Sequence, residues 1–176
     1  MTYHKILVAI DRSPLADLVL DRAVDLAQKE SAQMMVFHTV EIEATANVPP
    51  VVGTGMGLVP STGRTIPEVQ RQRIDAQNEQ AQEYLRTCAD KAAARGIATE
   101  YDRKVGDPGS LICQEAVSWG ADLIVVGRRG RKGMREMLLG SVSNHVIHNA
   151  HCCVLVVQGL VPTEETTPPP SELGKK

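Results

Sequence analysis

The 176-residue chain has few aromatic side chains: one Phe, one Trp and three Tyr, which together make up 3% of its residues. So few rings cannot form the stacking surfaces on which proteins bind single-stranded nucleic acids. Neither sign of charge dominates, because 19 Lys and Arg residues stand against 21 Asp and Glu residues, for a formal net charge of −2. We therefore expect no nucleic-acid or membrane partner, and any bound anion must be held by a local site.

Long apolar runs and paired cysteines are also missing. The first apolar run, residues 6–10, ends at Asp11 and is too short for a signal peptide or a membrane span, so we expect a cytoplasmic protein. The four cysteines form no C-x-x-C pair and have no His at metal-ligand spacing, so we expect reduced, mostly buried thiols and no metal site made of protein side chains. A hydrophobic content of 43% is enough for one domain with a largely aliphatic core.

Short apolar runs alternate with helical patterns along the chain. Strands are expected over residues 6–10, 34–40, 98–105, 123–126 and 153–157. Helices are expected from Ser13 and Pro14 to about residue 29, and over residues 67–95, 107–119 and 141–149. This alternation is typical of an α/β domain with a parallel sheet and helices on both of its faces.

Two segments do not follow this alternation. Residues 44–66 are rich in Pro and Gly and have no sustained period, so they are expected to form a flexible loop inserted in a domain that spans residues 1–160. Residues 161–176 contain too few apolar side chains to offset the entropy of ordering, and we expect a disordered C-terminal tail.

The segment after the fourth expected strand carries the clearest chemical signal. It contains Gly127, two residues, Gly130, nine residues, and then Gly140 followed by Ser141. Glycines at a strand end and at a helix start let backbone N–H groups approach a phosphate, which a Cβ would block. The hydroxyls of Ser141 and Ser143 can reach the same phosphates. The cations of this segment are Arg128, Arg129, Arg131, Lys132 and Arg135. These residues together predict the local anion site.

Four segments in order resemble the universal stress protein family. They are Val8-Ala9-Ile10-Asp11-x-Ser13, Gly106-Asp107-Pro108, residues 121–127, and the G-x2-G-x9-G-S motif that ends at Ser141. The resemblance covers residues 3–158. It implies a Rossmann-like fold, similar to the adenine nucleotide alpha hydrolases, with five parallel strands in the order 3-2-1-4-5. In members that keep the glycine motif, it also implies binding of ATP or another adenine nucleotide.

The resemblance further implies which residues meet the nucleotide. Asp11 would contact the adenine or ribose edge, and the glycine motif would hold the phosphates. The ligand-binding residues expected on this basis are Ala9, Ile10, Asp11, Arg12, Ser13, Val40, Val126, Gly127, Arg129, Gly130, Gly140, Ser141, Val142 and Ser143. Arg12 replaces the usual glycine of the family, so it would either contact phosphate or narrow the entrance.

The last strand of the family commonly pairs with its twin across a two-fold axis. The corresponding residues here are the apolar Val154, Leu155, Val156 and Val157, so we expect a homodimer through this strand. The usual proline before this strand is replaced by Cys153, a change that should not affect the nucleotide.

No pattern in the chain predicts dedicated catalysis. It has no G-x-x-x-x-G-K-[ST] loop, no G-x-G-x-x-G after the first strand and no G-x-S-x-G elbow, which disfavours a rapid ATPase or a dehydrogenase. We predict a nucleotide-dependent stress-response switch with an unknown protein partner, capable at most of slow ATP hydrolysis with Mg or Mn. The alternatives are an interaction or chaperone-like dimer with a vestigial loop, in which the glycines only serve turns and Asp11 only ends a strand, and an adenylyl transferase.

Overall fold

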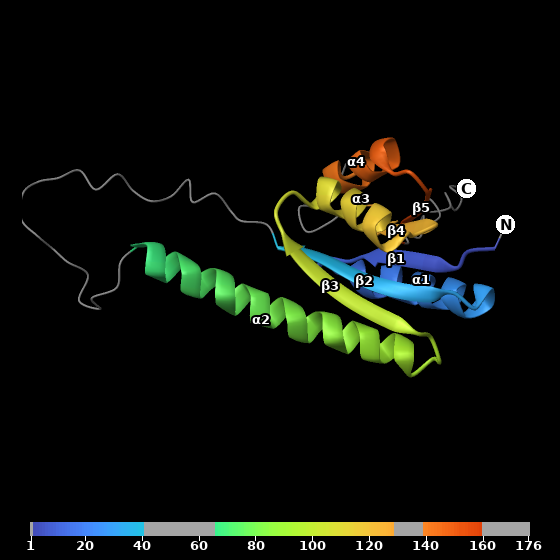
Figure 1. Cartoon of the computed structure of the whole chain (residues 1–176), viewed down its shortest axis with the longest axis horizontal. Coiled ribbons are helices and arrows are strands. Elements are labelled where there is room, and N and C mark those ends of the chain that lie inside the picture. The colour runs from blue at the N-terminus through green and yellow to red at the C-terminus, as the bar shows by residue number, and fades with distance from the viewer. Residues whose placement is uncertain (1, 41–65, 129–138, 160–176) are drawn as a thin grey trace, which may run out of the picture.

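The computed structural model describes residues 2–40, 66–128 and 139–159, and within 66–78 it describes the backbone only. The elements, in chain order, are β1 (Lys5–Ala9), α1 (Ala16–Glu30), β2 (Gln33–Val40), α2 (Ile66–Ala93), β3 (Thr99–Val105), α3 (Pro108–Trp119), β4 (Leu123–Gly127), α4 (Ser141–Asn149) and β5 (Cys153–Val157) (Figure 1). The expected tail and, except for Ile66, the expected inserted loop lie outside the described residues.

The five strands form one parallel sheet in the order β3-β2-β1-β4-β5, which confirms the expected fold class and strand order. The central strand β1 pairs with β2 on one side and with β4 on the other. Ala9 lies opposite both Phe37 of β2 and Val126 of β4, and Gly127 lies opposite Val157 of β5. The carboxyl ends of β1 and β4 therefore lie side by side where the strand order reverses, the usual place for a ligand in such a sheet.

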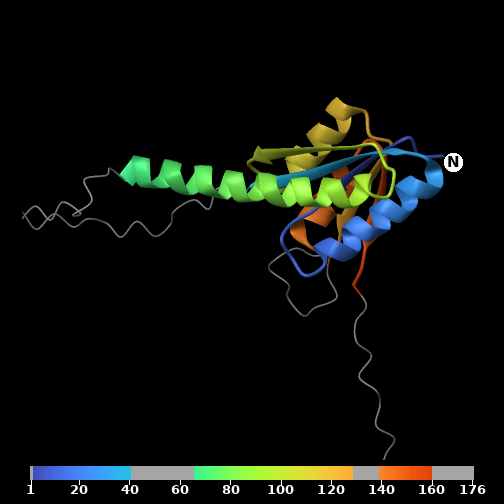
Figure 2. The same ribbon diagram turned by 90° about the horizontal axis from the view of Figure 1, so that it is seen from below.

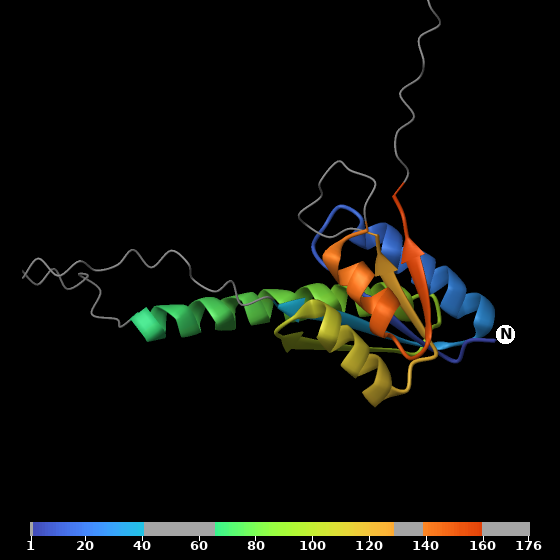
Figure 3. The ribbon, with the colours of Figure 1, turned by 90° about the horizontal axis from the view of Figure 1, so that it is seen from above.

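Helices cover both faces of the sheet. α1 and α2 lie on one face (Figure 2), and α3 and α4 lie on the other (Figure 3). Because successive strand residues point to opposite faces, Ile6 and Val8 join the core under α1 and α2, while Leu7 joins the core under α3 and α4. The single Phe, Phe37, is fully buried in this second core, and the other buried members of both cores are aliphatic except for Met34, Met35 and Cys88.

The helix starts follow local capping chemistry. α3 begins as expected, because the Asp107 carboxylate accepts a hydrogen bond from the Ser110 amide at 2.9 Å. α1 begins at Ala16, two residues later than the expectation from Ser13 and Pro14. The Ser13 carbonyl accepts the Ala16 amide at 3.0 Å, so residues 13–16 form a tight turn ahead of the helix.

The carboxyl half of α2 packs on the sheet, through buried residues that include Ala81, Leu85 and Cys88. Its amino-terminal half extends beyond the sheet (Figures 1 and 2). None of the helices in the described ranges is long and apolar enough to cross a membrane.

Candidate functional site

The turn after β1 forms one side of the candidate site. Ile10 extends the strand by one hydrogen bond, from its amide to the Phe37 carbonyl at 3.0 Å. The chain then turns, and the Asp11 carboxylate accepts the Ser13 amide at 3.0 Å. This Asx turn fixes one carboxylate oxygen of the half-buried Asp11 at the carboxyl end of the central strand.

Arg12 is directed toward α2. Its guanidinium donates to the Gln80 side-chain oxygen at 3.3 Å and lies over the Tyr84 ring, 5.7 Å from the ring centre. Both contacts are to α2, not to the glycine segment, so the structure places Arg12 at the flank of the site. Contact between Arg12 and a phosphate remains a prediction.

The end of β4 and the start of α4 form the other side. The Arg128 amide donates to the Val157 carbonyl at 2.7 Å, which extends the pairing of β4 with β5. The Gly140 amide donates to the Arg128 carbonyl at 2.9 Å. This bond brings Gly140 beside the end of β4. Arg129 and Gly130 lie outside the described residues.

The first turn of α4 has open backbone donors. Gly140 is its N-cap residue and offers no side-chain acceptor, and the first intrahelical bond runs from the Asn144 amide to the Gly140 carbonyl at 2.9 Å. Within the described part of the chain, the amides of Ser141, Val142 and Ser143 have no hydrogen-bond acceptor. Uncapped amides at the positive end of the helix dipole attract an anion, whereas the start of α3 is closed by a carboxylate.

The torsion angles of Gly140 sharpen the role of this glycine. Its φ of −66° lies in a region open to any residue, so the backbone conformation does not require glycine here. What glycine provides is the absence of a side chain in front of the open amides.

The two serines of α4 differ in their surroundings. Ser141 is exposed to solvent, whereas Ser143 is 1% exposed. The Ser143 hydroxyl donates its one proton to the carbonyls of Arg128 and Gly140, at 2.9 and 3.0 Å. Ser143 therefore fixes α4 to the end of β4, and the Ser141 hydroxyl is the one that solvent, or a ligand, can reach.

Two of the three valines expected at the site are buried, whereas Val142 is only partly buried. Val126 and Val40 are 3% and 8% exposed, so the structure offers their backbone to a ligand more than their side chains. Val40 lies three residues beyond Phe37, the partner of Ala9, and its carbonyl accepts the Gly106 amide at 3.1 Å. The structure thus gathers the ends of β1 and β4 and the start of α4, and it places Val40 further along β2.

The comparison with known proteins decides the family. The model of the universal stress protein family matches residues 2–158. The chain belongs to the universal stress protein family. The universal stress protein Sll1388 of Synechocystis is 42% identical over 162 residues, which are 90% of this chain and 99% of that protein.

Solved universal stress proteins share the fold. UspA from Lactobacillus plantarum has a TM-score of 0.71 at 23% identity, over 89% of this chain and 99% of that one. A universal stress protein from Archaeoglobus fulgidus, solved in complex with dAMP, has a TM-score of 0.57 at 25% identity, over 89% of this chain and 98% of that one. A third solved universal stress protein, in complex with cAMP, has a TM-score of 0.59 at 23% identity, over 89% of this chain and 98% of that one.

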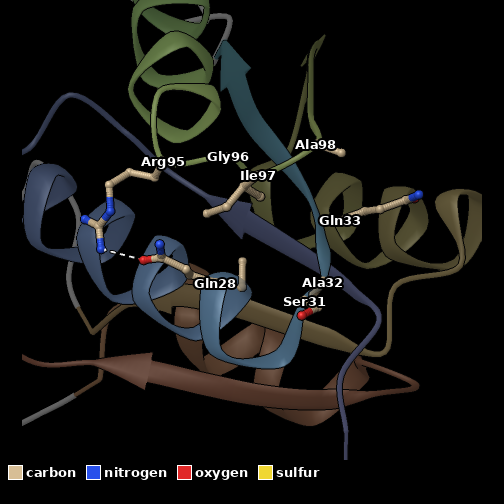
Figure 4. Close-up of a pocket in the computed structure, with 9 residues that line it drawn as sticks. Gln28, Ser31, Ala32, Gln33, Arg95, Gly96, Ile97 and Ala98 are labelled. Carbon is tan, nitrogen blue, oxygen red and sulfur yellow. Dashed lines mark hydrogen bonds between the residues drawn. The ribbon is translucent and has the colours of Figure 1, made fainter.

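This universal stress protein also has a surface pocket of about 260 Å³ at the opposite, amino-terminal edge of the sheet (Figure 4). Its lining includes Gln28 and Arg95, and the Arg95 guanidinium is already bound to Gln28 at 2.9 Å and to Asp25 at 3.0 Å. The pocket therefore offers no open cation to an anionic ligand. Among the residues that the structure describes, no three His, Cys, Asp or Glu side chains are grouped as metal ligands.

Sequence reasoning missed two residues that support the site. His38 and Tyr84 bind the backbone of the turn after β1, from β2 and from α2. Neither belongs to a motif, and Tyr84 lies 73 positions from its partner Asp11, so no local signal identifies it.

Proposed function

We propose that this universal stress protein binds an adenine nucleotide, with ATP as the first candidate, between the turn after β1 and the start of α4. The observation that carries the proposal is the row of open amides on Ser141, Val142 and Ser143 beside the end of β4. Three parallel donors at a helix start suit a phosphate group. The dAMP complex of the Archaeoglobus relative supports the choice of an adenine nucleotide.

The residues present fit the two ends of such a ligand. The phosphates would lie at the amides of α4 and the Ser141 hydroxyl, and Arg129 and Gly130 would act from the glycine segment. The ribose would donate its hydroxyls to the Asp11 carboxylate, which is only half-buried. Because the chain has so few aromatic rings, the adenine would lie against backbone and aliphatic groups near Ala9 rather than in a stack.

The bound nucleotide would act as a signal more than as a substrate. We assign no catalytic residue, and Mg or Mn would be held mainly by phosphate oxygens. In this proposal the protein works in the cytoplasm as a stress-response switch whose occupied and empty states differ in affinity for a protein partner.

We further propose that the protein is a homodimer that pairs through β5. The two edge strands of the sheet differ sharply in composition. β3 carries Glu100, Asp102, Arg103 and Lys104, and charged side chains discourage pairing with another chain. β5 has only apolar side chains and Cys153, with Leu155 38% exposed, so a second copy would cover an edge that otherwise promotes aggregation. Analytical ultracentrifugation tests this directly, and a strictly monomeric protein at high micromolar concentration would contradict it.

Isothermal titration calorimetry with ATP, AMP, dAMP and cAMP tests the binding proposal. Mass spectrometry of small molecules released by heating the purified protein would identify a nucleotide that co-purifies. Gly140→Asp should abolish binding, because its carboxylate would occupy the front of the open amides and repel phosphate. Ser118→Asp adds the same charge at an exposed position of α3 and should leave binding unchanged.

Two outcomes would contradict the proposal. Absence of any released adenine nucleotide, together with no heat of binding for all four compounds, would refute it. Equal affinities of the wild type and Gly140→Asp would refute the placement of the phosphates. Phosphate release above background in the presence of Mg or Mn would show slow hydrolysis at the same site.

A further inference from the structure

We infer that Tyr84 of α2 is a positioning residue for the nucleotide: it holds the backbone of Asp11, so that ligand affinity depends on a helix that does not itself touch the ligand. The inference rests on the proposed function, and it names a regulatory contact of the same site. Three contacts on the turn after β1 carry it.

The first contact fixes the end of β1. The carbonyl of Ile10 accepts a hydrogen bond from the Nδ1 atom of His38, at 2.8 Å. A carbonyl can only accept, so Nδ1 carries the proton. The His38 ring is 8% exposed and meets the Tyr84 ring edge to face, with 6.4 Å between ring centres. The ring that holds Ile10 is therefore itself packed against Tyr84.

The second contact fixes Asp11. The Tyr84 hydroxyl donates to the Asp11 carbonyl at 3.1 Å, across the gap between α2 and the sheet. Burial, the main cause, raises the pKa of Tyr84 well above its usual value of 10.0, so the hydroxyl keeps its proton at physiological pH. The donor is therefore present at physiological pH.

The third contact involves Arg12, which stands where the family usually has glycine. Its guanidinium covers the face of the Tyr84 ring and donates to Gln80 one turn earlier on α2. The Tyr84 side chain thus has the Asp11 carbonyl at its hydroxyl and Arg12 on its ring. An arginine at this position binds the turn to α2 through its side chain, and a glycine has no side chain that could make these contacts.

These contacts link α2 to the Asp11 carboxylate. The Asx turn ties that carboxylate to the Ser13 amide, so a shift of the Asp11 backbone moves the ribose-binding group with it. By linkage, a nucleotide that orders the turn after β1 must also tighten the packing of α2. Any event that displaces α2 must in turn lower the affinity for the nucleotide. Tyr84 lies about one helical turn after Ala81, which is buried.

The test compares Tyr84→Phe with Tyr101→Phe by calorimetry with ATP. Tyr101 is 40% exposed on β3, and it makes the matched control for loss of a tyrosine hydroxyl. We expect Tyr84→Phe to weaken ATP binding by about three- to tenfold, the usual range for one buried hydrogen bond, and Tyr101→Phe to leave it unchanged. Asp11→Ala and the double variant Asp11→Ala with Tyr84→Phe should bind equally, because Tyr84 acts through Asp11.

The outcomes separate this inference from the proposed function. If the wild type binds ATP and Tyr84→Phe binds within twofold of it, or if Tyr84→Phe weakens binding equally in the Asp11→Ala protein, the positioning role is wrong. If the wild type binds no nucleotide, the proposed function fails, and hydrogen exchange of the Ser13 amide in the free protein then decides the positioning role. Faster exchange in Tyr84→Phe than in Tyr101→Phe would support it, and equal exchange would refute it.

Discussion

Exchanging each serine of α4 for alanine should separate structure from binding at the site. Ser143 is buried and donates to two backbone carbonyls, whereas Ser141 is exposed next to the open amides. Ser143→Ala should therefore destabilise the fold. Ser141→Ala should weaken nucleotide binding and leave the stability of the fold unchanged.

The size of the Ser143→Ala effect follows from what its partners retain. The Arg128 carbonyl still accepts the Gly140 amide, and the Gly140 carbonyl still accepts the Asn144 amide. Neither carbonyl is orphaned, so the cost is that of one ordinary hydrogen bond, about 1 kcal/mol, and not the larger penalty for a buried unpaired group. For a chain of this length this corresponds to a fall in Tm of roughly 2–4 °C.

Ser141→Ala should change the free energy of unfolding by less than about 0.5 kcal/mol, as is usual for an exposed position. It should lower ATP affinity by about tenfold, since a hydrogen bond to a charged phosphate contributes more than a neutral one. Urea denaturation and calorimetry on the same three proteins provide both quantities. The reasoning is refuted if Ser143→Ala is as stable as the wild type, or if Ser141→Ala is the less stable of the two variants.

Three further predictions concern α3, namely its amino-terminal cap and its contacts with α4 and β3. Asp107→Ala should lower the free energy of unfolding by about 1 kcal/mol, because it removes the cap of α3. The Ser110 hydrogen bond lowers the pKa of Asp107, so this stabilisation should be full above pH 4 and should decline as the pH falls further. Asp107→Asn should keep the cap and lose this pH dependence, which urea titrations at pH 7 and pH 3 would measure. Gly109→Ala should destabilise the folded protein by about 1–3 kcal/mol, because the new Cβ would lie 2.7 Å from Cγ and 2.8 Å from Cβ of His145. Thermal unfolding should show that the same substitution costs less in a His145→Ala background. Lys104 and Glu115 form an ion pair between β3 and α3. Lys104→Ala should lower the free energy of unfolding by about 2 kcal/mol, because it leaves the Glu115 side chain, which is 9% exposed, without its cation, whereas Glu115→Gln should cost less than about 1 kcal/mol, because the Lys104 side chain is 41% exposed to water. Equal shifts of the urea midpoint in the two variants would contradict this.

Most of the fold could be predicted because its signals are local. β1, β2, β4 and β5 are short, largely apolar runs, whereas β3 is rich in charged side chains. Each of these strands was predicted to within about two residues. The start of α1 was misplaced because Ser13 and Pro14 also suit a turn. The Asp11 carboxylate takes the Ser13 amide, and the Ser13 carbonyl takes the Ala16 amide, so this serine serves the turn instead of capping the helix.

The site was predictable only where residues close together in the sequence form a recognisable motif. The glycine motif marks the end of β4 and the start of α4, and the structure places these two ends together. The contacts of His38 and Tyr84 depend on how β2 and α2 pack, and no spacing in the sequence reports that packing. Arg12 illustrates the same limit, because its departure from the family pattern is visible in the sequence but its direction toward Gln80 and Tyr84 is not.

The different roles of Ser141 and Ser143, by contrast, follow from helical geometry. Successive residues of an α-helix are about 100° apart, so residues 141 and 143 face nearly opposite directions. Val146 lies three positions after Ser143 on the same side, and both are buried in the structure. Any helix that has Gly140 as its N-cap and turns Val146 toward the sheet must turn Ser143 inward and leave Ser141 in solvent. The first turn of α4 therefore contains two serine hydroxyls, but the helical period leaves only that of Ser141 open to a nucleotide.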